Sequence, residues 1–380
     1  MTPLDHIRLL DLSRQLPGPF CSTLLADLGA DVLTIAAPGD PFGTGIPFLA
    51  RNKRSMTLNL KSDAGRDIFL RLAAEADVVL EGFRPGVMAR LGIGWERLSA
   101  LNPRLVYCAI SGYGQDGPYR DRVGHDVNYL AAAGVLNYVG EAGGPPVIPG
   151  VQIADIGAGS FMAAVGILTA LIARERTGRG QLVDVAMLDG AVAWNVYHTL
   201  LYLLSGHPPE RGTTQLTGHF PCYAVYETRD GRHVTVGAYE EHFWATLCRH
   251  FGREDFIPQQ WDDGAKRAEM FGFFRAAFRT KTLAEWVAEL GGVDICFAPV
   301  ATLDETFADP QVRHRQMVVE HGGTLTLGTP IKLSRTPGGT RSAPPRFNQH
   351  GEAVLRARGF SDAEIAQLAR DGVLVQKRRR

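Results

Sequence analysis

Three short polar segments of this 380-residue chain carry side chains that could move protons. A histidine precedes an aspartate in Gly124-His125-Asp126, and a single carboxylate, Asp155, stands in the apolar segment 153–157. A further carboxylate, Glu240, follows an expected strand end at Gly237. His125 and Asp155 would supply two proton carriers, and a carboxylate to orient one of them completes the minimum for general acid-base chemistry.

Each segment also has a purely structural interpretation, and the residues alone leave both interpretations open. Asp126, Asp155 and Glu240 each stand where an expected helix begins. Carboxylates are favoured there because they accept hydrogen bonds from unpaired backbone N–H groups. His125 would then be an ordinary surface histidine.

Other catalytic signatures are weak or missing. The segment 112–117 matches the dinucleotide pattern G-x-G-x-x-G, but Pro118 follows it directly and its composition is that of a turn. The sequence contains no Walker loop, no G-x-S-x-G elbow and no HExxH motif. His242 and His250 are spaced wrongly to share a helical face, so we expect no metal site.

The elements that must position these residues alternate between strand-like and helix-like patterns. Strand-like runs are expected at 7–12, 31–35, 78–80, 105–110 and 181–185. Helix-like runs are expected at 21–28, 64–76, 87–91, 155–171 and 188–204. This alternation predicts an α/β fold with a Rossmann-like parallel sheet in a large domain.

The pattern changes near residue 205, which predicts a second and smaller α+β domain. Residues 222–236 are expected to form a hairpin with Asp230-Gly231 in its turn, followed by helices at 241–251, 265–278 and 283–290. We therefore expect a large domain over 1–204, a small domain over 205–325, and a C-terminal segment over 326–380 that returns to the large domain.

Composition limits the partners and the cellular compartment. The 40 Lys plus Arg balance the 40 Asp plus Glu, which argues against a nucleic-acid binder. We see no signal peptide, and the most apolar stretch, 159–171, is shorter than the ~20 residues of a membrane span. Five scattered cysteines without a CxxC pair favour reduced thiols and a cytoplasmic location.

Over nearly its whole length the chain resembles the class III CoA-transferase (CaiB/BaiF) family. The resemblance rests on many ordered stretches, among them Leu16-Pro-Gly-Pro, Asn52-Lys-Arg-Ser, Phe83-Arg-Pro-Gly, Ser111-Gly-Tyr-Gly-Gln-Asp-Gly-Pro-Tyr, Thr177-Gly-Arg-Gly-Gln, Val183-Asp-Val-Ala-Met, Phe220-Pro-Cys-Tyr-Ala-Val-Tyr-Glu-Thr and Ala308-Asp-Pro-Gln-Val-Arg. It implies an enzyme acting on acyl-CoA, and it makes the segment 112–117 ordinary family sequence rather than a nucleotide motif.

Within the family, the histidine of Gly124-His125-Asp126 resembles the α-methylacyl-CoA racemase branch. Members that transfer CoA commonly have an aromatic residue there, and some carry a run of glycines where this chain has Gly237-Ala-Tyr-Glu-Glu. The resemblance implies that Asp155 matches the catalytic aspartate and that Glu240 supports the histidine. The implied reaction is an isomerisation in lipid metabolism, epimerising C2 of a 2-methylacyl-CoA by 1,1-proton transfer through an enolate. Asp155 at a helix start, with Gly157 and Gly159, would let the thioester approach backbone N–H groups.

Two alternatives remain open at this point. In a CoA transferase, Asp155 would be a nucleophile that carries the acyl group and then CoA, and His125 would be a bystander. In a binding protein for CoA esters, neither residue would act chemically.

The resemblance also implies a CoA site, with CoA carried as the substrate thioester and with no prosthetic group. The positions that line the nucleotide part are Leu16, Pro17, Leu58, Lys61, Gly82, Phe83, Arg90 and Leu91. Lys61 and Arg90 suit phosphates, and Phe83 could stack beside the adenine. One segment departs from the family pattern: residues 34–38 read Thr-Ile-Ala-Ala-Pro where a basic residue and a Val/Ile-Glu pair are usual, so a contact is expected to be lost or rerouted.

Finally, the resemblance implies an intertwined, interlocked homodimer. Each active site would lie between the large domain of one chain and the small domain of its partner, with Glu240 reaching His125 across the interface. An apolar channel for the acyl chain could be lined by Tyr129, Tyr138, Trp194, Tyr197 and Phe220.

Overall fold

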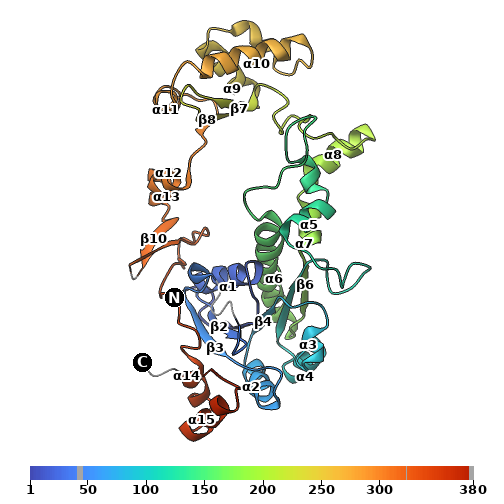
Figure 1. Cartoon of the computed structure of the whole chain (residues 1–380), viewed down its shortest axis with the longest axis vertical. Helices are drawn as coiled ribbons and strands as arrows, with labels where there is room; N and C mark the ends of the chain where they lie inside the picture. The colour runs from blue at the N-terminus through green and yellow to red at the C-terminus, as the bar shows by residue number, and fades with distance from the viewer. Residues whose placement is uncertain (41–45, 322, 376–380) are drawn as a thin grey trace. The chain divides into compact units, whose positions relative to one another are not determined.

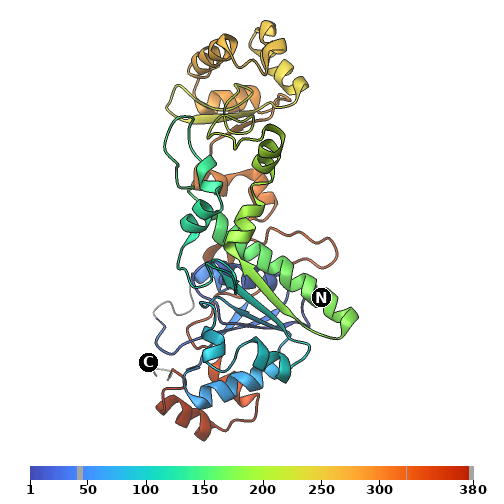
Figure 2. The same ribbon diagram turned by 90° about the vertical axis from the view of Figure 1, so that its right-hand side faces the viewer.

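The computed structural model describes residues 1–40, 46–321 and 323–375, and the chain forms two compact units (Figures 1 and 2). The first unit comprises Met1–Ala133, Pro149–Trp194 and Pro310–Arg380, and the second comprises Gly134–Ile148 and Asn195–Asp309. This grouping by contacts differs from the ranges expected from composition. Residues 195–204 belong to the second unit, and residues 310–325 belong to the first.

The first unit is built on a six-stranded sheet in the order β3-β2-β1-β4-β5-β6. The strands are β1 (Arg8–Asp11), β2 (Asp31–Ala36), β3 (Lys53–Thr57), β4 (Val78–Glu81), β5 (Val106–Ser111) and β6 (Leu182–Ala186). All neighbours pair in parallel, which confirms the expected α/β class and parallel sheet. The strand order reverses between β1 and β4, and ligands bind at such switch points, beyond the carboxyl ends of the strands.

Helices cover both faces of this sheet (Figure 1). One face carries α1 (Pro17–Asp27) and α6 (Met162–Thr177), which also contact each other. The other face packs into the main apolar core with α2 (Asp63–Ala74), α3 (Val87–Arg90), α4 (Trp95–Leu101), α14 (Gly351–Arg356) and α15 (Asp362–Arg370). The unit also contains α5 (Asp126–Ala132), α7 (Met187–Ala193), α13 (Pro310–His314) and the hairpin β10 (Val318–His321) and β11 (Thr324–Leu327).

A buried ion pair joins the end of β1 to the start of β3. Lys53 Nζ lies 3.6 Å from the carboxylate of Asp11, and both side chains are almost completely buried. The same ammonium donates to the carbonyl of Pro19 at 2.9 Å and to Ser22 Oγ at 2.7 Å. Ser13 donates both its N–H and its hydroxyl to Asp11. This network fixes the loop between β1 and α1.

The C-terminal segment returns to the first unit beside β3. Asn52 Oδ1 accepts the backbone N–H groups of Arg341 at 2.6 Å and Ser342 at 2.9 Å. Further along, the N–H of Thr57 donates to Asn348 Oδ1 at 2.8 Å. These long-range hydrogen bonds occupy the outer edge of β3.

The second unit contains the expected hairpin and helices. Strands β7 (Tyr223–Glu227), β8 (His233–Gly237) and β9 (Phe297–Pro299) form an antiparallel sheet, and Gly231 in the β7–β8 turn has φ 72°. Against it lie α9 (Glu241–His250), α10 (Ala265–Phe278) and α11 (Leu283–Leu290), around a core rich in aromatic rings. The unit also contains α8 (Val196–Ser205) and α12 (Leu303–Ala308).

The expected helix over 155–171 is longer than its apolar sequence indicated. A π-helical segment, η3 (Ile153–Phe161), runs directly into α6. Together they span 25 residues, which is long and apolar enough to cross a bilayer, and half of the most apolar part is buried within the protein. Both segments contact α1, as a core helix does.

The buried pair yields a prediction about stability. Lys53→Met should lower the free energy of unfolding by about 3–5 kcal/mol, because it leaves the Asp11 carboxylate buried without its counter-ion. Urea denaturation monitored by circular dichroism measures this loss.

The next residue along β3 provides a matched control. Arg54 pairs with Asp31 at 2.6 Å, but both side chains are about two-fifths exposed. Arg54→Met should therefore cost less than about 1 kcal/mol. Equal losses from the two variants would show that the buried pair has no special role.

Candidate active site

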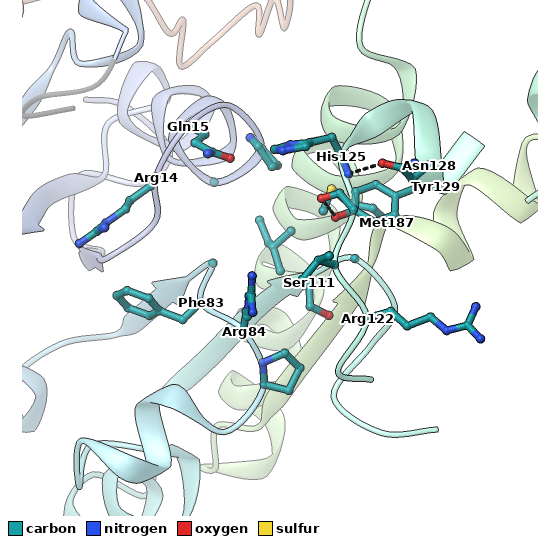
Figure 3. Close-up of a pocket in the computed structure, with 18 of the residues that line it drawn as sticks. Arg14, Gln15, Phe83, Arg84, Ser111, Arg122, His125, Asn128, Tyr129 and Met187 are labelled. Carbon is teal, nitrogen blue, oxygen red and sulfur yellow. Dashed lines mark hydrogen bonds between the residues drawn. The ribbon is translucent and has the colours of Figure 1, made fainter. Parts of the chain in front are cut away.

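A pocket of about 660 Å³ opens at the carboxyl ends of the central strands (Figure 3). Its walls come from the loops after β1 (14–18), β4 (82–85) and β5 (111–129), together with Met187 after β6. These loops flank the point between β1 and β4 where the strand order reverses. The pocket therefore lies where this type of sheet binds its ligands.

The pocket is cationic. It is lined by four guanidinium groups, those of Arg14, Arg84, Arg120 and Arg122. Within the described part of the chain, no acidic side chain lines it. Guanidinium groups bind phosphates and carboxylates through paired, charge-assisted hydrogen bonds. The arrangement suits a ligand that carries several negative charges.

Arg14 and Phe83 lie in loops that follow two different strands, β1 and β4, and their side chains meet at the pocket. Arg14 lies over the ring of Phe83, with its guanidinium carbon 5.7 Å from the ring centroid. Its Nε is also 3.1 Å from the carboxylate of Asp40. The following residue, Gln15, has φ 62° and lines the pocket, a conformation that costs a non-glycine residue on the order of 1 kcal/mol. The Asp11–Lys53 network holds the loop that bears this strain.

The predicted CoA-contacting residues fall into three groups. Pro17, Gly82 and Phe83 line the pocket. Leu58 is 1% exposed, and its side chain belongs to the apolar core on the α2 side of the sheet.

The other predicted contacts are not among the residues that line the pocket. Leu16 and Leu91 are half-buried, and Lys61 and Arg90 are exposed. A Cβ built on Gly86 would lie 3.3 Å from Arg90 and 3.1 Å from the pocket-lining Arg120, so both guanidinium groups approach the same turn.

Sequence reasoning missed the pocket arginines as ligands. Arg84 belongs to the family-like stretch Phe83-Arg-Pro-Gly, and no sequence motif indicates that Arg14, Arg120 or Arg122 binds a ligand. A signal was available for two of them, because Arg14 and Arg84 stand in Gly/Pro-containing loops directly after expected strands. Arg14 also pairs with Asp40, two residues beyond the segment 34–38 that lacks the usual basic residue.

His125 stands at the start of α5, on the rim of the pocket. It is the residue that precedes the first turn of the helix, and its backbone N–H donates to Asn128 Oδ1 at 3.0 Å. The side chain is exposed and lines the pocket. In Figure 3 the imidazole points from α5 towards the loop that carries Gln15.

Asp155 lies in the first turn of η3 and is half-buried. The pKa of Asp155 is raised to about 6, mainly by burial and then by the nearby charge of Asp126, while His125 acts in the opposite direction. Burial and the charge of Asp155 also raise the pKa of Tyr129 to about 12. The structure thus brings Asp155 within electrostatic reach of His125, Asp126 and Tyr129. With a pKa near neutrality, the carboxyl group can both give and take a proton.

The surroundings of Asp155 differ from the expected arrangement in two respects. Its own backbone N–H is occupied, because it donates to Asp126 Oδ1 at 3.0 Å. The glycines expected to admit a thioester lie close to neighbouring side chains, so their lack of a Cβ also serves packing. A Cβ on Gly157 would lie 2.7 Å from the ring of Trp194, and one on Gly159 would lie 3.1 Å from Pro17.

Glu240 belongs to the second unit, where it precedes the first turn of α9. Its carbonyl accepts the N–H of Trp244 at 3.1 Å, and its side chain is exposed. Among the described residues, no hydrogen bond or ion pair engages its carboxylate. That carboxylate lies near Cys296, whose pKa is raised first by burial and then by Glu240.

The segment 112–117 is a loop after β5, not the start of a helix. Gly114 N–H donates to Ser111 Oγ at 2.9 Å, and Gln115 N–H donates to Asp184 at 3.0 Å. The next helix begins only at Asp126. In the ranges that the structure describes, no group of His, Cys, Asp and Glu comes together that could hold a metal ion.

Comparison with known proteins agrees with the fold. The chain matches CoA-transferase family III over residues 4–351. It is 39% identical over 374 residues to α-methylacyl-CoA racemase of Mus musculus, covering 98% of this chain and 97% of the relative. It is 31% identical over 405 residues to succinyl-CoA:glutarate CoA-transferase of Mus musculus, covering 99% and 91%.

A solved structure gives the same result. The crystal structure of a CaiB/BaiF family protein from Brucella suis superposes with a TM-score of 0.81 at 30% identity, covering 94% of this chain and 99% of that one. The chain therefore belongs to CoA-transferase family III, the CaiB/BaiF family. It is an enzyme of that family, with racemases and CoA transferases both among its relatives.

The cluster around Asp155 yields a prediction that requires no substrate. Asp126→Asn should lower the pKa of Asp155 from about 6, because a neighbouring negative charge is removed. The amide oxygen can still accept the N–H of Asp155. Carboxyl ¹³C NMR titration of aspartate-labelled protein measures the shift, with Asp155→Asn identifying the resonance.

A second variant moves the same pKa in the opposite direction. His125→Ala should raise it, because a group that favours the carboxylate is lost. If neither variant shifts the titration of Asp155, the three side chains are not coupled as described.

Proposed function

We propose that this enzyme is an α-methylacyl-CoA racemase, which epimerises C2 of a 2-methylacyl-CoA thioester. The observation that carries the proposal is the pairing of His125 with Asp155: an imidazole on the rim of the pocket and a carboxyl group with a pKa of about 6 that responds to it. Two groups able to exchange a proton near neutral pH are what a two-base reaction requires. The racemase of Mus musculus at 39% identity supports the same choice.

The cationic pocket would hold the nucleotide part of CoA. CoA carries a pyrophosphate and a ribose phosphate, and the four guanidinium groups offer charge-assisted hydrogen bonds to them. Phe83, half-buried against the core and beneath Arg14, offers a face for the adenine. Lys61 and Arg90, both exposed, could add further phosphate contacts. Such binding would use the energy of the remote nucleotide to position the thioester at His125.

The proposed reaction removes the proton on C2 and returns one to the opposite face. With one substrate hand His125 takes the proton and protonated Asp155 donates one, and with the other hand the roles exchange. Removal of the proton leaves an enolate, whose oxygen needs nearby hydrogen-bond donors. The N–H of Asp155 can serve only if Asp126 releases it. Glu240 would orient the imidazole, as a carboxylate does in other histidine sites.

We also propose the interlocked homodimer, in which Glu240 of one chain serves His125 of the other. Each unit exposes large apolar side chains on a helix, a feature typical of association surfaces. The side chains that are more than half exposed include Val165 and Ile172 on α6, and Val196, Leu203 and Leu204 on α8. Four of the five cysteines are buried and none is paired, which supports the proposed cytoplasmic location.

CoA transfer is the second candidate. The relatives include succinyl-CoA:glutarate CoA-transferase of Mus musculus at 31% identity, which supports CoA transfer as an alternative reaction. Asp155 would then attack the thioester and form an acyl-enzyme anhydride, and CoA would next displace the acyl group to leave a thioester on Asp155. An acceptor acid would complete the cycle, and His125 would have no chemical role.

Proton exchange at C2 separates the two candidates. In D₂O, with a 2-methylacyl-CoA and no acceptor acid, the wild-type enzyme should invert C2 and incorporate deuterium there, as measured by mass spectrometry and chiral analysis. His125→Ala and Asp155→Ala should each lower the rate of inversion by about a hundredfold or more. His6→Ala, which changes an exposed histidine outside the pocket, should have no effect.

The opposite result points to transfer. If several acyl chains show no exchange while an added carboxylic acid receives CoA, the racemase proposal fails. A CoA thioester on Asp155, found by mass spectrometry, would then establish the second candidate.

Mixed dimers test the shared site. Inactive His125→Ala and Glu240→Ala chains, refolded together, should recover up to about a quarter of the wild-type activity, because half of the dimers would hold one intact site. His125→Ala mixed with Asp155→Ala should recover none, because both residues lie in the first unit of the same chain. Recovery in neither mixture, with dimers present, would exclude the shared site.

A further inference from the structure

Glu81 is a buried carboxyl group beside the pocket that the proposed reaction does not use. It is the last residue of β4, its side chain is 4% exposed, and the pocket-lining turn 82–85 begins directly after it. Its Oε2 accepts the backbone N–H of Phe83 at 2.6 Å, and Tyr107 on β5 donates to its Oε1 at 3.4 Å. A single side chain therefore ties the pocket-lining turn to the sheet beneath it.

We propose that Glu81 is a positioning residue that makes ligand binding in the cationic pocket depend on pH. When ionised, it fixes the turn that carries Phe83 and Arg84, and when protonated, it holds that turn less firmly. The inference rests on the proposed binding of CoA in this pocket and adds a regulation of that same site.

The strength of the Phe83 contact depends on the charge of its acceptor. A hydrogen bond to a carboxylate is roughly twice as strong as one to a neutral oxygen. Phe83 also lies under the guanidinium of Arg14. The position of Phe83 therefore affects the positions of two pocket cations, Arg14 in the loop after β1 and its own neighbour Arg84. Loosening the turn would therefore disturb two of the four cations together.

The groups around Glu81 allow it to titrate near neutral pH. The pKa of Glu81 is raised to about 7, because burial and, to a smaller extent, the carboxylate of Asp184 on β6 outweigh the Phe83 N–H and the Tyr107 hydroxyl, which lower it. The buried thiol of Cys108 lies within electrostatic reach of Glu81, and burial raises the pKa of that thiol so that it stays neutral. Among the described residues, no cationic side chain lies within ion-pairing distance of Glu81. Glu81 is thus ionised above about pH 7 and protonated below it.

The test uses 3′-dephospho-CoA as the probe, because its pyrophosphate keeps a constant charge across this pH range. Isothermal titration calorimetry from about pH 5.5 to about pH 8.5 should show wild-type affinity rising about three- to tenfold, with a midpoint near pH 7. Glu81→Gln should abolish the rise and give an affinity close to the low-pH value throughout.

Two further variants should move the midpoint without abolishing the rise. Tyr107→Phe removes a donor that favours the carboxylate, so the midpoint should move to higher pH. Asp184→Asn removes a negative charge, so the midpoint should move to lower pH. Circular dichroism at both ends of the range identifies any variant that has not folded, and a purely structural role for Glu81 would not produce these opposite shifts.

The inference is overturned if wild-type affinity does not rise with pH, or if Glu81→Gln keeps the wild-type rise. Failure of the proposed function gives a different result: a wild-type enzyme that binds neither CoA nor the probe at any pH has no CoA site in this pocket, and the regulation falls with it. Binding without racemisation or transfer would leave the pH dependence of Glu81 standing and reject only the chemistry.

Discussion

The active-site pocket depends on one buried ion pair, Asp11 with Lys53, at the carboxyl end of β1 and the start of β3. Two charges withdrawn from water are tolerated only when each is paired and hydrogen-bonded, and here Ser13 of the next loop, with Ser22 and the carbonyl of Pro19 in α1, provides the hydrogen bonds. That requirement fixes the entry into α1 and the strained Gln15 that precedes it. The first wall of the pocket is therefore set by electrostatics in the core.

Around this frame the molecule places opposite charges in different environments. The pocket gathers guanidinium groups at its open walls, an arrangement that suits a polyanion, while Asp155 stands half-buried beside another carboxylate. Glu81 is buried more deeply still. Desolvation raises the pKa values of both carboxyl groups into the range where they change charge near neutral pH.

Sequence patterns found most elements of the sheet but missed one strand. The sequence predicted strands β1, β2, β4, β5 and β6, because a short apolar run bounded by turns is typical of a buried strand. Strand β3 was not expected, because it begins with Lys53 and Arg54, and only the partner Asp11 makes burial of Lys53 possible. The helix expected at 188–204 is two helices, α7 and α8, whose ends belong to different units. Local periodicity cannot show such a break, because both halves are equally apolar.

The sequence by itself determined the family, the parallel α/β fold and the three side chains proposed for chemistry, since these follow from residue types and their order along the chain. Only the tertiary structure decided which cations line the pocket, that Asp126 occupies the N–H of Asp155, and that Gly157 and Gly159 make room for neighbouring helices. It also decided that Leu58 faces the core. Proximity and burial depend on contacts between residues that are distant in the sequence. The raised pKa of Asp155 arises from both, because burial and the neighbouring Asp126 cause it.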